Sequence, residues 1–117
     1  TGNATDFGDL TVARYSTGAC SDGTKGVWGG GYNNANSNVI DYVTIATTGN
    51  AIDFGDLSVA RKGLAACSDG TKGVWGGGYG GGLFNTIDYV TIASTGNATD
   101  FGDLTVARGY LGACSGN

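Results

Sequence analysis

Short stretches in which apolar and polar residues alternate recur along the chain, separated by runs of Gly, Asn, Asp and Ser. The clearest stretch is residues 39–47 (VIDYVTIAT), where Ile40 and Tyr42 share one face of a strand and Asp41 and Val43 share the other. A Gly-rich stretch at residues 27–32 comes before it, and an Asp-Gly turn at residues 21–26 comes before the Gly-rich stretch. We therefore predict four short strands at residues 19–20, 27–32, 39–47 and 51–57, with turns at 21–26 and 48–50.

This pattern repeats with a period of 47 residues. Residues 1–47 and 48–94 differ at 13 positions, and residues 95–108 repeat residues 1–14 without a change. A tandem unit of this size is expected to form one supersecondary element that buries its apolar faces against its neighbours. Four antiparallel strands in such a unit are typical of a β-propeller blade. The alternative that the pattern leaves open is a β-solenoid or a filament of stacked units.

The repeated residues also resemble the kelch repeat. That family has an arginine before its first strand, a diglycine ending the second, a tyrosine in the third and a tryptophan in the fourth. Here the matching residues are Arg14, Gly29 to Gly31, Tyr42 and Phe54, so a third glycine is added and Phe replaces Trp. Trp28 and Trp75 lie on the glycine strand instead. The resemblance implies an all-β fold of four-stranded antiparallel blades in a kelch-like β-propeller.

The blade boundaries follow from this comparison. We expect residues 1–14 to hold the outer strand of a preceding blade, with its strand at 4–10, and residues 15–61 and 62–108 to form two full blades. Residues 109–117 would hold the inner strand of a following blade, at 111–114. Because a propeller needs about four to eight blades, two cannot close a ring. The chain is therefore expected to associate with itself or to belong to a longer array.

The composition excludes several kinds of chemistry. The chain has no His, and 6 basic against 10 acidic residues give a net charge of −4. These values argue against His-based catalysis or metal binding and against nucleic acid as a partner. No apolar run approaches the ~20 residues of a membrane span, so membrane insertion is not expected. We predict a non-enzymatic protein without cofactor or metal. The remote alternative is an enzyme domain of the kind built on kelch propellers, such as a copper oxidase.

The acidic residues are predicted to have structural roles. The Asp-Phe-Gly tripeptide at Asp6, Asp53 and Asp100 resembles a kinase magnesium motif, but the other kinase motifs are missing. Two Asp residues spaced by three on a strand point to opposite faces, so one pair cannot chelate calcium alone, although calcium binding stays open. We expect ion pairs instead, and Trp28 and Trp75 as structural residues. The expected pairs join Asp9, Asp56 and Asp103 to Arg14, Arg61 and Arg108, respectively. The cysteines, one per copy at Cys20, Cys67 and Cys114, are expected to be small buried residues without disulfides.

The differences between copies fall mainly in two segments, at residues 15–18 and 33–37 of the first copy. In an up-and-down blade both segments lie at one end, and the two invariant turns lie at the other. Loops on a rigid scaffold often carry function, so we predict that the variable end binds a protein or glycan surface. Relaxed constraint at exposed loop tips explains the same pattern equally well. The candidate residues are Tyr15, Ser16, Thr17, Asn33, Asn34, Asn36, Lys62, Leu64, Leu83, Phe84 and Tyr110.

These observations favour a structural or adhesion module. A fibre, virion or cell-surface protein would suit such a repeat, in an extracellular setting rather than the cytoplasm. Its expected partners are further copies of itself and a protein or glycan surface.

Overall fold

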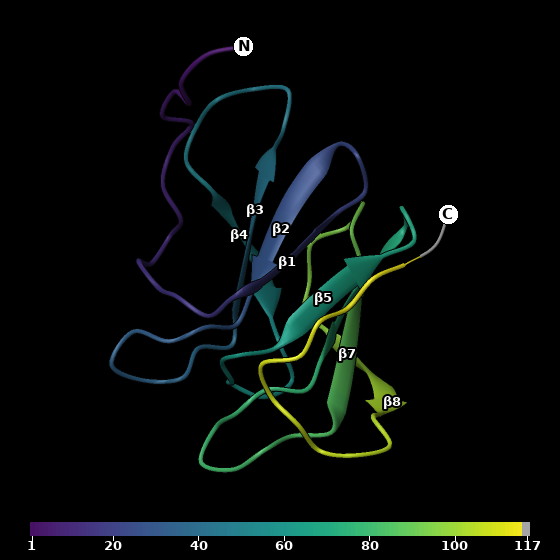
Figure 1. Ribbon diagram of the computed structural model, residues 1–117. Coiled ribbons are helices and arrows are strands. Elements are labelled where there is room, and N and C mark those ends of the chain that lie inside the picture. The colour runs from purple at the N-terminus through teal and green to yellow at the C-terminus, as the bar shows by residue number, and fades with distance from the viewer. Residues whose placement is uncertain (116–117) are drawn as a thin grey trace.

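The described residues, 1–115 of a computed structural model, form two four-stranded antiparallel sheets and no helix (Figure 1). Each strand pairs with the next one along the chain, so both sheets are up-and-down meanders. The all-β class and the four strands per repeat are thus confirmed. The first sheet contains β1 (Gly18–Ser21), β2 (Lys25–Gly29), β3 (Val39–Thr44) and β4 (Ile52–Asp56). The second contains β5 (Ala65–Ser68), β6 (Lys72–Gly76), β7 (Thr86–Thr91) and β8 (Thr99–Asp103).

The second strand of each repeat is shorter than its Gly-rich sequence suggested. β2 ends at Gly29 rather than at residue 32, because Gly30 and Gly31 adopt positive φ angles of 71° and 111°. A side chain at Gly30 would meet the carbonyl oxygen of Arg61 and the side chain of Leu64. Gly29 therefore ends the strand, while Gly30 and Gly31 form a left-handed turn that leads into the next loop.

The invariant turn between β1 and β2 is fixed by its own side chains. The Ser21 hydroxyl accepts a hydrogen bond from the N–H of Gly23 (2.9 Å), and Asp22 Oδ1 accepts from the N–H groups of Lys25 (2.7 Å) and Thr24 (2.8 Å). These backbone donors, Lys25 first, hold the pKa of Asp22 below its usual value. The same bonds recur in the second repeat, which explains why this turn is unchanged between copies.

The Asp-Phe-Gly tripeptide also has a structural role. Asp53 Oδ1 accepts a hydrogen bond from the N–H of Gly55 (3.1 Å), and the turn that follows β7 then packs against this segment. The N–H of Gly96 donates to the carbonyl of Phe54 (2.7 Å), and Asn97 Oδ1 accepts from the N–H of Asp56 (3.0 Å). The tripeptide therefore connects β4 of one sheet to the other sheet.

This connection predicts a difference between two equivalent glycines. Gly55 and Gly102 have φ angles of 148° and 145°, but a Cβ at Gly55 would overlap the carbonyl oxygen of Gly96, whereas Gly102 faces open space. We expect Gly55→Ala to lower the free energy of unfolding by about 2–4 kcal/mol, combining overlap with backbone strain. Gly102→Ala should lower it by only about 1–2 kcal/mol through strain. Urea denaturation of both variants measures the difference, and equal losses would contradict the packing described.

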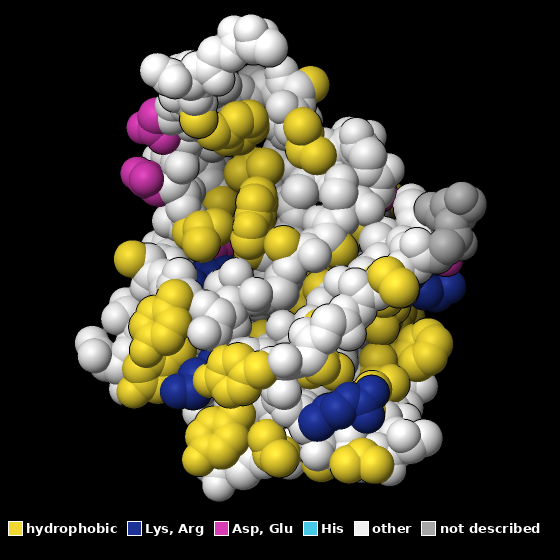
Figure 2. Space-filling model, viewed as in Figure 1, with side chains coloured by type: hydrophobic (Ala, Val, Ile, Leu, Met, Phe, Trp, Pro, Cys, Tyr) yellow, Lys and Arg dark blue, Asp and Glu magenta, His cyan; other side chains and the backbone are white. Residues whose placement is uncertain are grey.

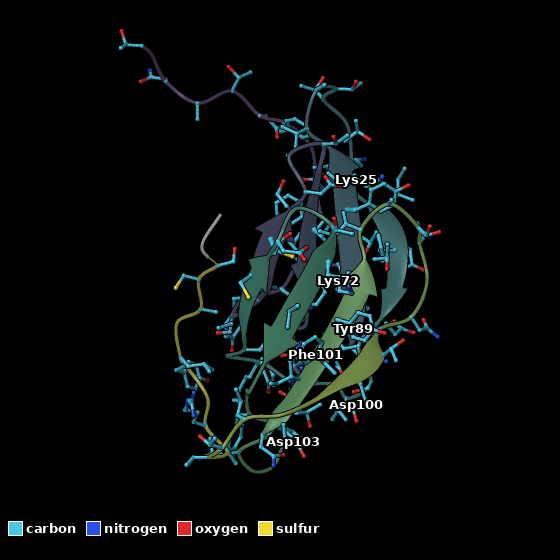
Figure 3. All side chains as sticks on the ribbon, turned by 90° about the vertical axis from the view of Figure 1, so that its right-hand side faces the viewer. Lys25, Lys72, Tyr89, Asp100, Phe101 and Asp103 are labelled. Carbon is cyan, nitrogen blue, oxygen red and sulfur yellow. The ribbon has the colours of Figure 1, made fainter. Side chains whose placement is uncertain are left out.

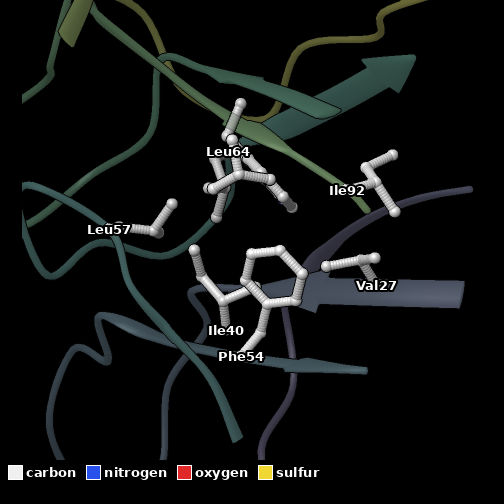
Figure 4. Close-up of a cluster of buried hydrophobic side chains, with 8 residues drawn as sticks. Val27, Ile40, Phe54, Leu57, Leu64 and Ile92 are labelled. Carbon is white, nitrogen blue, oxygen red and sulfur yellow. The ribbon is translucent and has the colours of Figure 1, made fainter. Parts of the chain in front are cut away.

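The core lies between the two sheets. Four buried side chains of the first sheet and the residue after it (Val27, Ile40, Phe54 and Leu57) meet four of the second sheet and its flanking residues (Leu64, Trp75, Val90 and Ile92); Figure 4 labels six of the eight. The indole of Trp75 lies on Gly29, where a Cβ would be 2.7 Å from Nε1, and its N–H donates to the carbonyl of Gly18 (3.0 Å). The bare backbone of β2 thus admits a large ring from the neighbouring sheet.

The flanking segments differ from expectation. Residues 4–10 and 111–114, predicted as outer and inner strands, are not strands in the structure. A strand needs a ladder to a neighbour, and among the described residues neither segment pairs in a ladder with another strand. The first segment still occupies the expected place, because the N–H groups of Gly49 and Ala51 donate to the carbonyls of Phe7 and Asp9 (both 2.8 Å). Residues 116–117 of the predicted segment 109–117 lie outside the described residues.

Candidate binding surface

A buried ion pair in each repeat holds the chain that leads into the sheet. Arg14 Nη1 lies 3.0 Å from Asp41 Oδ2, and Arg61 Nη1 lies 2.9 Å from Asp88 Oδ2, with all four side chains fully buried. The Arg61 guanidinium also donates to the carbonyls of Gly77 (2.7 Å) and Trp75 (3.2 Å). Each arginine therefore joins the incoming chain to the second and third strands of the sheet that follows it.

The predicted partners of these arginines were wrong. Neither Asp9 nor Asp56 meets Arg14 or Arg61, because both lie at the outer edge of a sheet, Asp56 on β4 and Asp9 on the N-terminal segment. The acids of the third strands, Asp41 and Asp88, are buried instead and take the arginines. Among residues 1–115, Arg108 forms no ion pair, with Asp103 or with any other acid. Its exposed guanidinium donates instead to the carbonyl of Val106 (3.3 Å).

Both variable segments lie at the same end of the sheets. Antiparallel meanders place the β2–β3 loop and the segment before β1 at one end, and a bridge joins Tyr15 of the first variable segment to Tyr32, which directly precedes the second. Their backbones exchange hydrogen bonds of 3.2 and 2.9 Å, and their rings meet edge to face with centroids 5.6 Å apart. Lys62 and Tyr79 form the equivalent bridge in the second repeat.

The two bridges are joined through one lysine. Lys62 Nζ lies 4.2 Å from the ring centroid of Tyr32 and 5.8 Å from that of Tyr79, so the ammonium sits between two aromatic faces. The ring of Tyr110 lies beside Gly63, next to this group. The lower half of Figure 2 shows such rings beside dark-blue side chains. We call Tyr15, Tyr32, Lys62, Tyr79 and Tyr110 the tyrosine surface.

The other predicted residues divide into surface and core. Asn33, Asn34 and Leu83 are exposed, while Ser16, Thr17, Asn36 and Phe84 are partly buried at this end of the sheets. Leu64 was placed wrongly, because it is 5% exposed and packs in the core against Gly30 and its neighbours. Sequence reasoning missed Tyr32 and Tyr79. The signal for them is the aromatic residue that follows each glycine triplet, at the end of a stretch that the sequence pattern predicts as a strand.

Three non-glycine loop residues adopt an unusual backbone conformation, and one of them is Asn34, with a φ angle of 60°. Ser16 and Tyr110, which occupy the position of Gly63 in the second repeat, have φ angles of 59° and 54°. This left-handed region costs a non-glycine residue energy, most of all a bulky one such as tyrosine. Strained backbone therefore occurs at Tyr110 of the tyrosine surface and at Ser16, next to Tyr15.

The cysteines are free thiols with different surroundings. Burial, followed by interaction with Cys67, raises the pKa of Cys20 to about 12, so this thiol is neutral at physiological pH. Cys67 is half-buried, whereas Cys114 is exposed, contrary to the expectation of three buried residues. Within residues 1–115, no three His, Cys, Asp or Glu side chains are grouped to hold a metal ion.

No protein-family model and no curated protein matches this chain. In the described part of the chain, no helix is long and apolar enough to cross a membrane.

Proposed function

We propose that the chain is a non-enzymatic binding module made of two kelch-like blades of a propeller-type array, and that its tyrosine surface binds carbohydrate. Two four-stranded meanders that pack through β1 and β5, with Gly29 under Trp75, support the blade assignment. A scaffold of this kind suits adhesion by a virion, fibre or cell-surface protein in an extracellular setting.

The observation that carries the binding proposal is the gathering of four tyrosines around Lys62 at one end. A tyrosine ring offers a flat apolar face and a hydroxyl, and it loses little conformational freedom on binding. The C–H faces of a sugar ring fit such flat surfaces, while its hydroxyls need polar partners. Asn33 and Asn34, exposed beside the rings, supply amide donors and acceptors.

A panel of immobilised oligosaccharides tests this function. We expect the chain to bind a subset of neutral or acidic glycans, and Tyr15→Ala or Tyr79→Ala to weaken that binding by about tenfold or more, as loss of an aromatic anchor does. The matched control is Ile52→Thr. Ile52 is 59% exposed, as Tyr15 is 61% exposed, but it lies at the opposite end, and the other copies carry Thr there.

Glycan binding that survives both tyrosine substitutions, or the absence of binding to any glycan on the panel, would contradict the proposal. Binding that Ile52→Thr weakens equally would place the site elsewhere on the sheets. Circular dichroism of each variant checks that the fold is retained.

A further inference from the structure

The first sheet has an open apolar face, whereas the equivalent face of the second sheet is buried in the core. A cavity of about 700 Å³ lies on the open face, lined by Trp28, Val43 and Ile45 together with Phe7 and Leu10 from the N-terminal segment. The equivalent residues of the second sheet belong to the core, so Ile92 is 0% exposed whereas Ile45 is 48% exposed. In Figure 2 hydrophobic side chains gather in the upper half, between the N-terminal segment and β1 and β2.

The second sheet leaves the complementary face open. A smaller cavity there is lined by Val74, Ile87 and Leu104, which correspond to Val27, Ile40 and Leu57 of the core. Phe101, beside Tyr89 in Figure 3, is 59% exposed, whereas its equivalent Phe54 is 3% exposed. The molecule thus carries both halves of its own internal interface, one at each end.

We propose that a second copy of this chain docks head to tail on these faces and repeats the contact between the two sheets. Trp28 of one copy then lies on Gly76 of the other and donates its N–H to the carbonyl of Ala65, as Trp75 does to Gly29 and Gly18 within the chain. Gly76 is free to receive it, since a Cβ there would have its nearest neighbour at 3.7 Å. This inference is independent of the carbohydrate proposal.

Docking requires an exchange of segments. Residues 95–108 of one copy have the same sequence as residues 1–14 of the next, and both would occupy the same site on the first sheet of that next copy. β8 is held in a ladder with β7, whereas residues 1–14 form no strand. The N-terminal segment is therefore the one displaced. Residues 109–115 of the arriving copy would likewise compete with β1 of the other copy. Because β1 is paired with β2, β1 remains in place and residues 109–115 move away.

Sedimentation velocity of the full 117-residue chain between ~5 and ~500 µM measures the association, which mass action makes concentration-dependent. We expect oligomers to form as the concentration rises. Gly76→Ala should raise the dissociation constant about tenfold or more, because its methyl group occupies the place of the Trp28 indole. The matched control is Gly82→Ala, also in open space but on the β6–β7 loop, which should leave association unchanged.

Two further glycines give effects of opposite sign. A Cβ at Gly8 would overlap the carbonyl of Gly49, so Gly8→Ala weakens the docking of residues 1–14 and should strengthen association. Gly102 of the arriving copy takes the same place, so Gly102→Ala should weaken association. A monomer at every concentration would overturn the proposal, as would association that Gly76→Ala and Gly102→Ala leave unchanged. Association that changes in these opposite directions supports it.

Discussion

Arg61→Met is expected to lower the free energy of unfolding by about 3–5 kcal/mol, the usual cost of leaving one partner of a buried ion pair without the other. Asp88 is fully buried and would keep only the N–H and hydroxyl of Ser58 as donors. The carbonyls of Gly77 and Trp75 would lose their guanidinium donor as well. Because small domains are stable by only about 5–15 kcal/mol, this loss should be plain in urea denaturation.

Arg108→Met is the matched control for this substitution. Arg108 occupies the same position in the repeat but is exposed, and its guanidinium donates to the carbonyl of Val106 rather than to a buried acid. Its replacement should change the free energy of unfolding by no more than about 0.5 kcal/mol, as surface substitutions usually do. Comparable losses in the two variants would show that the Arg61–Asp88 pair does not stabilise the sheet.

The strands could be predicted from the sequence because their signal is local. Alternation over residues 39–44 and the Asp-Gly turn at residues 22–23 depend on neighbouring residues alone, and the repeat shows the same signal twice. The strand ends were predicted less accurately, since β3 stops at Thr44 rather than at residue 47. The left-handed glycines after β2 could not be distinguished from strand glycines by composition.

The ion pairs could not be predicted because they are not local. Arg61 and Asp88 are 27 residues apart, and they meet only because the incoming chain crosses above β7. The pairing proposed from the sequence joined acids and arginines five residues apart, along one segment. Leu64 was misplaced for a similar reason. It varies between copies as a loop residue would, yet the sheet packing buries it.

The candidate surface was predicted only in part. Variation between copies indicated Tyr15, Lys62 and Tyr110, but it could not indicate Tyr32 or Tyr79, which are identical in the two repeats. These invariant rings are the ones that contact Lys62. The variable residues therefore mark the end of the sheets, and the invariant tyrosines complete the surface there.

Trp75→Ala is expected to lower the free energy of unfolding by about 3–5 kcal/mol, because it leaves a large cavity between the sheets. The indole is fully buried, covers Gly29 and donates to the carbonyl of Gly18, so one substitution removes packing and an inter-sheet hydrogen bond together. Trp75→Phe keeps an aromatic ring without the N–H and should cost less. Thermal and urea denaturation of both variants would rank these contributions.

Trp28→Ala provides the comparison within the same chain. Trp28 has the same neighbours in sequence, but it is only half-buried and lines the open cavity of the first sheet. At ~1 µM, where mass action keeps copies apart, Trp28→Ala should cost about 1–2 kcal/mol, in proportion to its smaller buried area. Its cost should rise with protein concentration if a second copy covers this face, whereas the cost of Trp75→Ala should remain large at every concentration. A loss for Trp28→Ala equal to that for Trp75→Ala at ~1 µM would contradict the open face, since mass action leaves no second copy to bury the ring.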